Sequence, residues 1–226
     1  MTTLPAAVLW DMDGTIIDTE PYWMAAETEL VVSFGGTWSH AEALTLVGQA
    51  LDYSARVLQS RGVDLPEDEI IETLTEIVSQ RVLTEELPWR PGARELLYAL
   101  REAGIPTALV TMSIRKLAEV VADAIDFEAF DHIVAGDDVT NGKPNPEAYL
   151  RAAELLGVDP TSCVAIEDSG PGVAAAVASG AATIAVPLHV ELAGSDTFTT
   201  WSSLADRTIA DLSDVLESST SRTVTP

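Results

Sequence analysis

The chain has 226 residues, of which 36 are acidic and 12 basic, so its formal net charge is −24. A surface this acidic would be repelled by nucleic acids and anionic membranes, and we expect neither as a partner. Hydrophobic residues make up 47% of the chain, which is enough for a packed core.

Several features of the chain predict a cytoplasmic protein. With one cysteine, Cys163, the chain has no partner for an internal disulfide, which favours a reducing compartment. No apolar run approaches the roughly 20 residues of a membrane helix. The amino terminus, MTTLPAAVLWD, lacks the basic region of a secretory signal. A monomer is the default expectation.

Five short apolar runs predict strands that are buried on both faces of a sheet, because they are too short for helices and do not alternate. They are AAVLW at 6–10, IPTALV at 105–110, HIVA at 132–135, CVAI at 163–166 and ATIAV at 182–186. Amphipathic helical patterns lie between them, for example at 92–104 and 145–157. This alternation predicts an α/β fold with a Rossmann-like parallel sheet covered by helices.

One long interval interrupts the alternation. Residues 17–87 contain only helical patterns, which predicts an inserted helical-bundle domain. The α/β core is then expected to comprise residues 1–16 and 88–226. Its last residues, 213–226, are expected to form a flexible tail.

Polar residues gather where the predicted strands end, and ligands of an open parallel sheet bind beyond those ends. The residues are Asp11 and Asp13 after the first strand, Thr111 and Ser113 after the second, Glu167 and Asp168 after the fourth, and Lys143 in the loop TNGKPNP. Clustered carboxylates raise one another's pKa unless a cation compensates them, and carboxylate oxygens are preferred ligands of Mg²⁺. We therefore predict a Mg²⁺ site beside a lysine that binds an anion such as phosphate.

Four segments carry a resemblance to a known family. They are DMDGT at 11–15, VTMS at 110–113, GKPNPEAY at 142–149 and IEDSGPG at 166–172. In this order they resemble the motifs of the haloacid dehalogenase (HAD) superfamily. The helical insertion resembles the cap of the subgroup that contains β-phosphoglucomutase and many sugar-phosphate phosphatases. The resemblance extends to about residue 212 and implies a HAD-like core with a helical cap.

The resemblance implies a role for each matching residue. Asp11 corresponds to the nucleophile that forms an aspartyl-phosphate and also binds Mg²⁺. Asp13 corresponds to the acid and base of the reaction, with its backbone carbonyl on the metal. Thr111, the backbone amide of Met112 and Lys143 correspond to the groups that hold the phosphoryl group.

Further positions follow from the same resemblance. Asp168 corresponds to a metal ligand, and Glu167 to a second one that binds directly or through water. Among the aromatic residues of the cap, Trp23 is the best candidate for contact with substrate, because it lies just past the first motif.

Other reactions of the superfamily fit the sequence less well. Dehalogenases lack the second aspartate and the metal, whereas Asp13 and Asp168 are present. Phosphonate hydrolases of this design require a cap lysine, and residues 17–87 contain no lysine.

A phosphomutase resembling β-phosphoglucomutase is the main alternative. Its basic cap positions correspond to Val47 and Leu51 here and its cap histidine to Trp23, although Arg56 lies nearby. A non-catalytic acidic binding protein on the same fold would not require nucleophile and acid together. We therefore predict a Mg²⁺-dependent phosphatase, a phosphoric monoester hydrolase that acts on a small phosphorylated metabolite such as a sugar or polyol phosphate.

Overall fold

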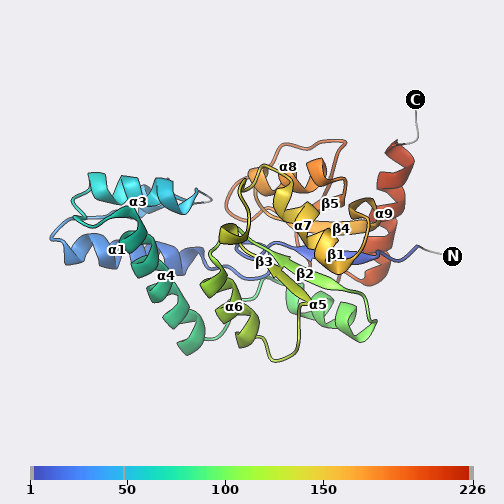
Figure 1. Cartoon of the computed structure of the whole chain (residues 1–226), viewed down its shortest axis with the longest axis horizontal. Coiled ribbons are helices and arrows are strands. Elements are labelled where there is room, and N and C mark those ends of the chain that lie inside the picture. Colours follow the sequence, from blue (N-terminus) through green and yellow to red (C-terminus); the bar gives the residue numbers. More distant parts are fainter. Residues whose placement is uncertain (1–2, 48, 224–226) are drawn as a thin grey trace. The chain divides into compact units, whose positions relative to one another are not determined.

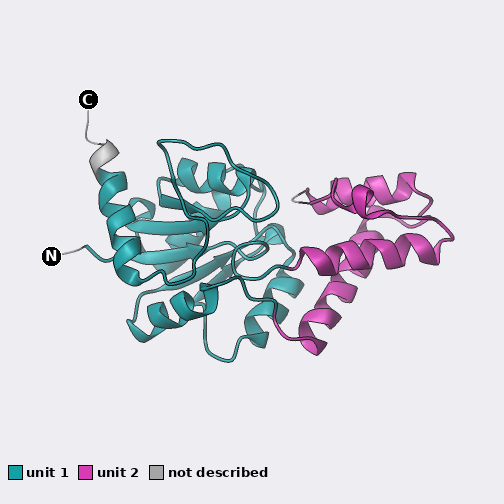
Figure 2. Ribbon diagram, turned by 180° about the vertical axis from the view of Figure 1, so that it is seen from behind, with its two compact units in different colours: residues 1–18, 88–226 teal, residues 19–87 magenta. Residues whose placement is uncertain are grey.

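The computed structural model describes residues 3–47 and 49–223. The chain divides into two compact units, one formed by residues 1–18 and 88–226 and the other by residues 19–87 (Figure 2). The first unit contains the sheet, and the second consists of helices (Figure 1).

The first unit is built on a parallel sheet with the strand order β3-β2-β1-β4-β5-β6 (Figure 1). The strands are β1 (Ala7–Trp10), β2 (Thr107–Val110), β3 (His132–Val134), β4 (Cys163–Glu167), β5 (Ala182–Ala185) and β6 (Thr199–Thr200). All residues of β1, β2, β4 and β5 are buried, which explains why their sequences are continuously apolar. The predicted α/β fold with a Rossmann-like parallel sheet is confirmed, while the edge strand β6 was not predicted.

Helices cover both faces of this sheet. They are α5 (Ala93–Glu102), α6 (Arg115–Ala124), α7 (Glu147–Leu156), α8 (Gly170–Ser179) and α9 (Ile209–Thr223), with short 3₁₀ turns at Gly136–Asp138 and Pro160–Ser162. The helices α7 and α8 pack side by side on one face, and α5 and α9 pack on the other (Figure 1). Parallel strands need such long connections, because a short turn cannot return the chain to the start of the next strand.

The carboxyl-terminal segment differs from its predicted form. Residues 213–226 were expected to form a flexible tail, but α9 continues to Thr223. Leu212, Val215 and Leu216 are buried and lie on one face of this helix, which packs against β4 and β5. Residues 224–226 of the expected tail lie outside the described residues.

The second unit contains α1 (Glu20–Ser33), α2 (His40–Ala43), α3 (Leu51–Ser60) and α4 (Glu67–Thr84). The long helix α4 packs against both α1 and α3. A capping box formed by Ser39 and Glu42 begins α2, and turns at residues 44–47 follow its end. The segment between α1 and α4 therefore forms two short helices, and residue 48 between them is not described.

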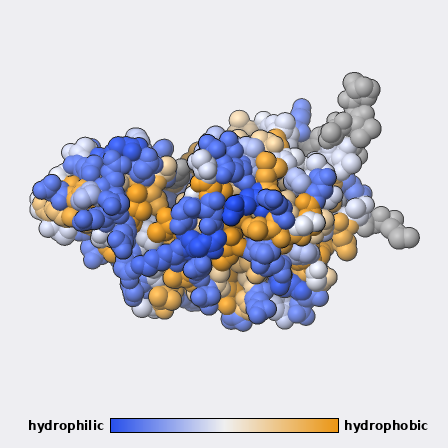
Figure 3. Space-filling model, in the orientation of Figure 1, coloured by the Kyte–Doolittle hydropathy of each residue, from blue (hydrophilic) through white to orange (hydrophobic). Residues whose placement is uncertain are grey.

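The surface is rich in hydrophilic side chains. On the face shown in Figure 3 they cover much of both units, with smaller hydrophobic areas among them. Within the described residues, no helix is both long and apolar enough to cross a bilayer.

Candidate active site

The predicted site residues of the first unit lie at the carboxyl ends of its three central strands. β1 lies between β2 and β4, so the chain segments that leave these strands lie side by side. Asp11 follows β1, Thr111 follows β2 and Glu167 ends β4. Lys143, in the loop before α7, reaches the same place with its side chain.

Lys143 is the centre of this arrangement. Its Nζ donates hydrogen bonds to Oδ1 of Asp11 at 2.6 Å, to Oε1 of Glu167 at 2.6 Å and to the carbonyl oxygen of Val110 at 2.9 Å. Its side chain is only 5% exposed. Burial alone would lower the pKa of Lys143, but the charges of Asp11 and Glu167 raise it above its ordinary value. The lysine is therefore a permanent positive charge.

Glu167 is fully buried and receives donors on both carboxylate oxygens. Oε1 accepts from Lys143 and from the hydroxyl of Tyr149, the latter at 2.8 Å. Oε2 accepts from the backbone amides of Asp168 and Ser169 at 3.2 and 3.3 Å and from the Ser169 hydroxyl at 3.1 Å. These contacts fix the orientation of the carboxylate.

Asp13 is bonded to a different set of groups. Its Oδ2 accepts from the hydroxyls of Ser113 at 2.8 Å and Thr111 at 3.3 Å. The backbone amide of Ser113 in turn donates to Oγ1 of Thr111 at 3.0 Å. Asp11 and Asp13 thus have different partners, a lysine for the first and hydroxyls for the second.

Two glycines make room for the carboxylates. Gly14 has a φ of +83°, and a Cβ atom there would lie 2.1 Å from Oδ2 of Asp168. A Cβ atom at Gly172 would lie 2.0 Å from the carboxyl group of Glu167. Both positions need the absence of a side chain, because no carbon and oxygen atoms approach that closely without overlap.

The carboxylates form a group that can hold a metal ion. Asp11, Glu167 and Asp168 each offer an oxygen, and these oxygens lie within 4.8 Å of one another. Burial, together with the charge of Glu167, raises the pKa of Asp11 to about 7 despite the opposing effect of Lys143. Burial and the charges of Asp11 and Glu167 raise the pKa of Asp168 to about 9. A divalent cation would relieve this repulsion, and an all-oxygen donor set suits Mg²⁺.

The remaining predicted residues are placed as follows. Met112 lies beside Lys143, whose backbone amide donates to the Met112 sulfur at 3.2 Å. Trp23 lies in α1 of the helical unit, so its contact with substrate stays a prediction. The structure thus brings together Asp11, Lys143, Glu167 and Asp168. Asp13 and Thr111 lie next to them.

Three further residues at the site have no role predicted from the sequence. From the sequence, Ser113 is identified only as a hydroxyl at the end of a strand. Tyr149 lies within the motif GKPNPEAY. Arg90 is buried and donates to the carbonyl oxygen of Val186 at 3.3 Å. Burial lowers the pKa of Arg90, partly offset by the charges of Asp168 and Asp18. No sequence signal marks the Tyr149 hydroxyl, because its acceptor Glu167 lies 18 positions further along the chain.

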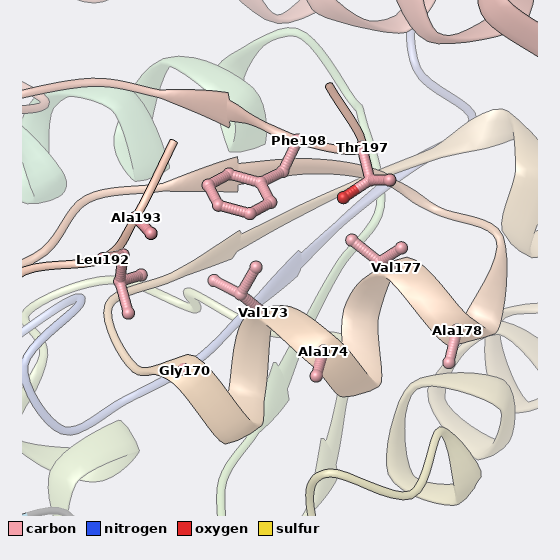
Figure 4. Close-up of a pocket in the computed structure, with 9 residues that line it drawn as sticks. All are labelled: Gly170, Val173, Ala174, Val177, Ala178, Leu192, Ala193, Thr197 and Phe198. Atoms are coloured by element: carbon pink, nitrogen blue, oxygen red, sulfur yellow. The ribbon is translucent and has the colours of Figure 1, made fainter. Parts of the chain in front are cut away.

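A separate hollow of the first unit lies beside α8. Val173 and Val177 of α8 face Leu192 and Phe198 across it, and Thr197 supplies a hydroxyl (Figure 4). These lining side chains carry no charge, which distinguishes the hollow from the carboxylate and lysine cluster.

The fold and the site together define a Rossmann-like α/β enzyme with an acidic, lysine-containing centre. Residues 5–180 match the family of haloacid dehalogenase-like hydrolases. The chain therefore belongs to this family and is a hydrolase. The predicted superfamily, with its subgroup of β-phosphoglucomutase-like proteins and sugar phosphatases, is confirmed.

Two of the curated relatives are named as phosphatases. Hexitol phosphatase B of Escherichia coli K12 is 33% identical over 186 residues, which cover 80% of this chain and 83% of that protein. The bifunctional riboflavin kinase/FMN phosphatase of Arabidopsis thaliana is 33% identical over 187 residues and 81% of this chain. That match spans about half of the Arabidopsis protein, at 49% of its length.

A solved structure is similar over almost the whole chain. CbbY of Rhodobacter sphaeroides, in complex with xylulose-(1,5)bisphosphate, superposes with a TM-score of 0.82 at 31% identity. The match covers 92% of this chain and 99% of CbbY. The arrangement of strands and helices is thus one found in a protein that binds a sugar bisphosphate.

Proposed function

We propose that this chain is a Mg²⁺-dependent phosphatase that hydrolyses a small phosphomonoester, with sugar and polyol phosphates as its substrates. The observation that carries the proposal is the different bonding of two neighbouring aspartates. Asp11 is paired with the buried ammonium group of Lys143, and Asp13 is held by the hydroxyls of Ser113 and Thr111. One carboxylate is thereby suited to attack and the other to proton transfer.

In the first step, a carboxylate oxygen of Asp11 attacks phosphorus and the bond from phosphorus to the ester oxygen breaks. Asp13 gives its proton to that oxygen, and the alcohol leaves. The phosphoryl group is then an acyl phosphate on Asp11. In the second step, Asp13 removes a proton from water, the water oxygen attacks phosphorus, and phosphate leaves with Asp11 restored.

Charge compensation is the main requirement of phosphoryl transfer. Lys143 lies 2.6 Å from Asp11 and offsets the charge that the phosphoryl group brings. Thr111 and the backbone amide of Met112 are assigned to the phosphoryl oxygens. The carboxylates of Asp11 and Asp168 and the carbonyl of Asp13 would hold Mg²⁺, with Glu167 close by. When bound, the ion neutralises phosphoryl oxygens and polarises the bond to phosphorus.

The substrate class rests on the relatives and on the helical unit. Hexitol phosphatase B acts, by its name, on hexitol phosphates, and CbbY binds a sugar bisphosphate. We assign Trp23 of the helical cap to contact with the uncharged part of the substrate. The buried free thiol of Cys163 supports a cytoplasmic location, and the acidic surface argues against nucleic-acid or membrane partners. A monomer stays the default expectation.

The phosphomutase alternative needs a cation in the cap for a second phosphate. Arg56 is the candidate close in sequence to the matching cap positions, and its guanidinium pairs with Asp52 at 2.8 Å and Glu67 at 3.1 Å. An arginine already held by two carboxylates is poorly placed to bind an anion, because a phosphate would have to displace them. Hydrolysis is therefore favoured over isomerisation.

The test is hydrolysis of p-nitrophenyl phosphate and of a panel of hexitol and hexose phosphates, with Mg²⁺ or with a chelator. We expect activity that the chelator abolishes and that Asp11→Asn lowers by at least about 1,000-fold. Activity that neither change affects would refute the mechanism. Incubation with β-glucose 1-phosphate distinguishes the alternative, since a mutase would form glucose 6-phosphate faster than free phosphate.

A further inference from the structure

We propose that Tyr149 is a positioning residue of this site. Its hydroxyl holds Glu167 as a hydrogen-bonded anion that aims Lys143 at Asp11, so that Glu167 does not bind the metal directly. The inference extends the proposed function, since it divides the acidic cluster into ligands and a supporting group.

The acceptor sites of Glu167 are already occupied by hydrogen-bond donors of the protein. An ionised carboxylate offers about four acceptor sites on its two oxygens. Tyr149 and Lys143 donate to Oε1, and Oε2 receives the three donors of the Asp168 and Ser169 segment. A metal ion could bind Glu167 only after displacing one of these donors.

The N–H donors of Lys143 are likewise all in use. An ammonium group has three N–H donors, and Nζ uses them on Asp11, Glu167 and the carbonyl of Val110. The direction of the bond to Asp11 therefore depends on where Glu167 lies. If Glu167 rotated toward a metal, Lys143 would lose one of its three acceptors. Its hydrogen bonds to Asp11 and to the Val110 carbonyl would then no longer be fixed in direction.

Tyr149 is suited to prevent that rotation. It lies in α7 with no exposed surface, and its hydroxyl is 2.8 Å from Oε1 of Glu167. Burial and the charge of Glu167 raise its pKa well above the ordinary value, so the hydroxyl stays a donor. Its ring also lies 5.2 Å from Nζ of Lys143, which a phenylalanine would retain. The substitution Tyr149→Phe thus removes the hydrogen bond and leaves the ring.

Gly172 also lies directly against the carboxyl group of Glu167. A Cβ atom there would overlap the Glu167 carboxyl group, so that group rests directly on the backbone at the start of α8. Asp168 has a different environment, since its carboxylate lies against Gly14 of the first motif. We therefore assign direct metal binding to Asp11 and Asp168, and an orienting role to Glu167.

The first experiment measures Mg²⁺ binding without substrate, by titration calorimetry of metal-free protein. Asp168→Asn should weaken Mg²⁺ binding by at least about 100-fold, because a ligand is lost. Glu167→Gln should weaken it by about 10-fold, because only a nearby charge is lost. Tyr149→Phe should leave the affinity within about threefold. Equal losses for Glu167→Gln and Asp168→Asn, or a 10-fold loss for Tyr149→Phe, would overturn the inference.

The second experiment measures kcat and KM on p-nitrophenyl phosphate. Tyr149→Phe should lower kcat about 10-fold and leave KM within about twofold, consistent with one charge-assisted hydrogen bond. The double variant Tyr149→Phe/Glu167→Gln should have the kcat of Glu167→Gln alone, because the tyrosine acts through the glutamate. An unchanged kcat for Tyr149→Phe, or effects that multiply in the double variant, would contradict it.

A matched control is Tyr98→Phe, because Tyr98 is exposed on α5. It should leave both kcat and Mg²⁺ affinity unchanged. Circular dichroism of each variant checks that it is folded. If the wild-type protein had no phosphatase activity, the proposed function would fail, while the calorimetric comparison of Glu167→Gln with Asp168→Asn would still decide the inference.

Discussion

Lys143 donates a hydrogen bond to Oδ1 of Asp11 over 2.6 Å, although the two residues are 132 positions apart in the chain. Both side chains are buried, with 5% and 9% of their surfaces exposed. The pair joins the loop before α7 to the end of β1, so it links two motifs that only the folded sheet brings together. A buried pair of this kind is costly to break, because one partner is then left as an uncompensated charge.

Lys143→Met should therefore affect both stability and activity. We expect the free energy of unfolding at pH 8 to fall by about 3–5 kcal/mol, because Asp11 and Glu167 lose their counter-charge. Phosphatase activity should fall by at least about 1,000-fold, since the phosphoryl charge is no longer offset. Urea denaturation and initial rates measure the two effects.

The other lysine, Lys116, provides the control. It lies exposed on α6, so Lys116→Met should change stability by no more than about 0.5 kcal/mol and leave activity intact. Equal effects of the two substitutions would mean that the buried pair has no special role.

Gly14→Ala tests the packing of Asp168 against the first motif. The added Cβ would lie 2.1 Å from Oδ2 of Asp168, so the carboxylate must move and Mg²⁺ affinity should fall by at least about 10-fold. Gly104→Ala is a matched control, since Gly104 also has a positive φ, +67°, but no atom within 4 Å of the added Cβ. Both variants should lose about 1–2 kcal/mol through backbone strain. Only Gly14→Ala should lose metal affinity, as measured by calorimetry, and a similar loss in Gly104→Ala would argue against a local effect.

The order and direction of the predicted strands are enough to predict part of this site from the sequence. Continuous apolar runs indicate buried parallel strands, and the carboxyl ends of such strands lie at one edge of the sheet. The strand pattern alone therefore groups Asp11, Thr111 and Glu167. Asp168 belongs to the same strand-end group, and the specific roles of Lys143 and Asp168 follow from the family resemblance. The structure adds the contact of Lys143 with Asp11 and the hydrogen bonds that fix each carboxylate.

Other features depend on packing that a sequence pattern does not contain. The hydroxyls of Ser113 and Tyr149 donate hydrogen bonds to carboxylates that only the folded chain brings near them. In the sequence alone, a serine or tyrosine near a motif is equally compatible with a plain packing role. The edge strand β6 has two polar residues, too few for a pattern. The extent of α9 depends on the burial of Val215 and Leu216, whose polar neighbours suggested a tail.

The metal-free protein should become less stable as pH rises. The pKa values of Asp168 and Asp11 are raised from 3.8 to about 9 and about 7, so the folded state favours their protonated forms. This contribution is fully present below pH 3.8 and is lost as pH rises to 7 for Asp11 and to 9 for Asp168. Added Mg²⁺ should restore stability more at pH 8 than at pH 5, because ionised carboxylates bind it.

Asp168→Asn separates this effect from other titrating groups. Relative to this variant, the chelated wild-type protein should lose up to roughly 5 kcal/mol between pH 5 and pH 9. Urea denaturation at several pH values gives the difference. A difference that does not change with pH would show that Asp168 is ionised throughout.

Glu27 provides a similar test in the helical unit. It lies in α1, is 4% exposed, and its Oε2 accepts from Nε1 of Trp38 at 3.2 Å. Burial raises its pKa from 4.5 to about 7, although the hydrogen bond from Trp38 opposes the change. The folded state therefore loses stability as pH rises from 4.5 to 7 and changes little above that range.

Glu27→Gln keeps an acceptor for Trp38 and removes the charge. Between pH 5 and pH 8 this variant should gain on the order of 2 kcal/mol relative to the wild-type protein, because only the wild-type residue must ionise in a buried position. Glu29→Gln, a substitution at an exposed position of the same helix, is the matched control. Thermal unfolding followed by circular dichroism at pH 5, 6.5 and 8 makes the comparison. Parallel pH profiles for Glu27→Gln and the wild-type protein would mean that Glu27 is ionised in the folded state over this whole range.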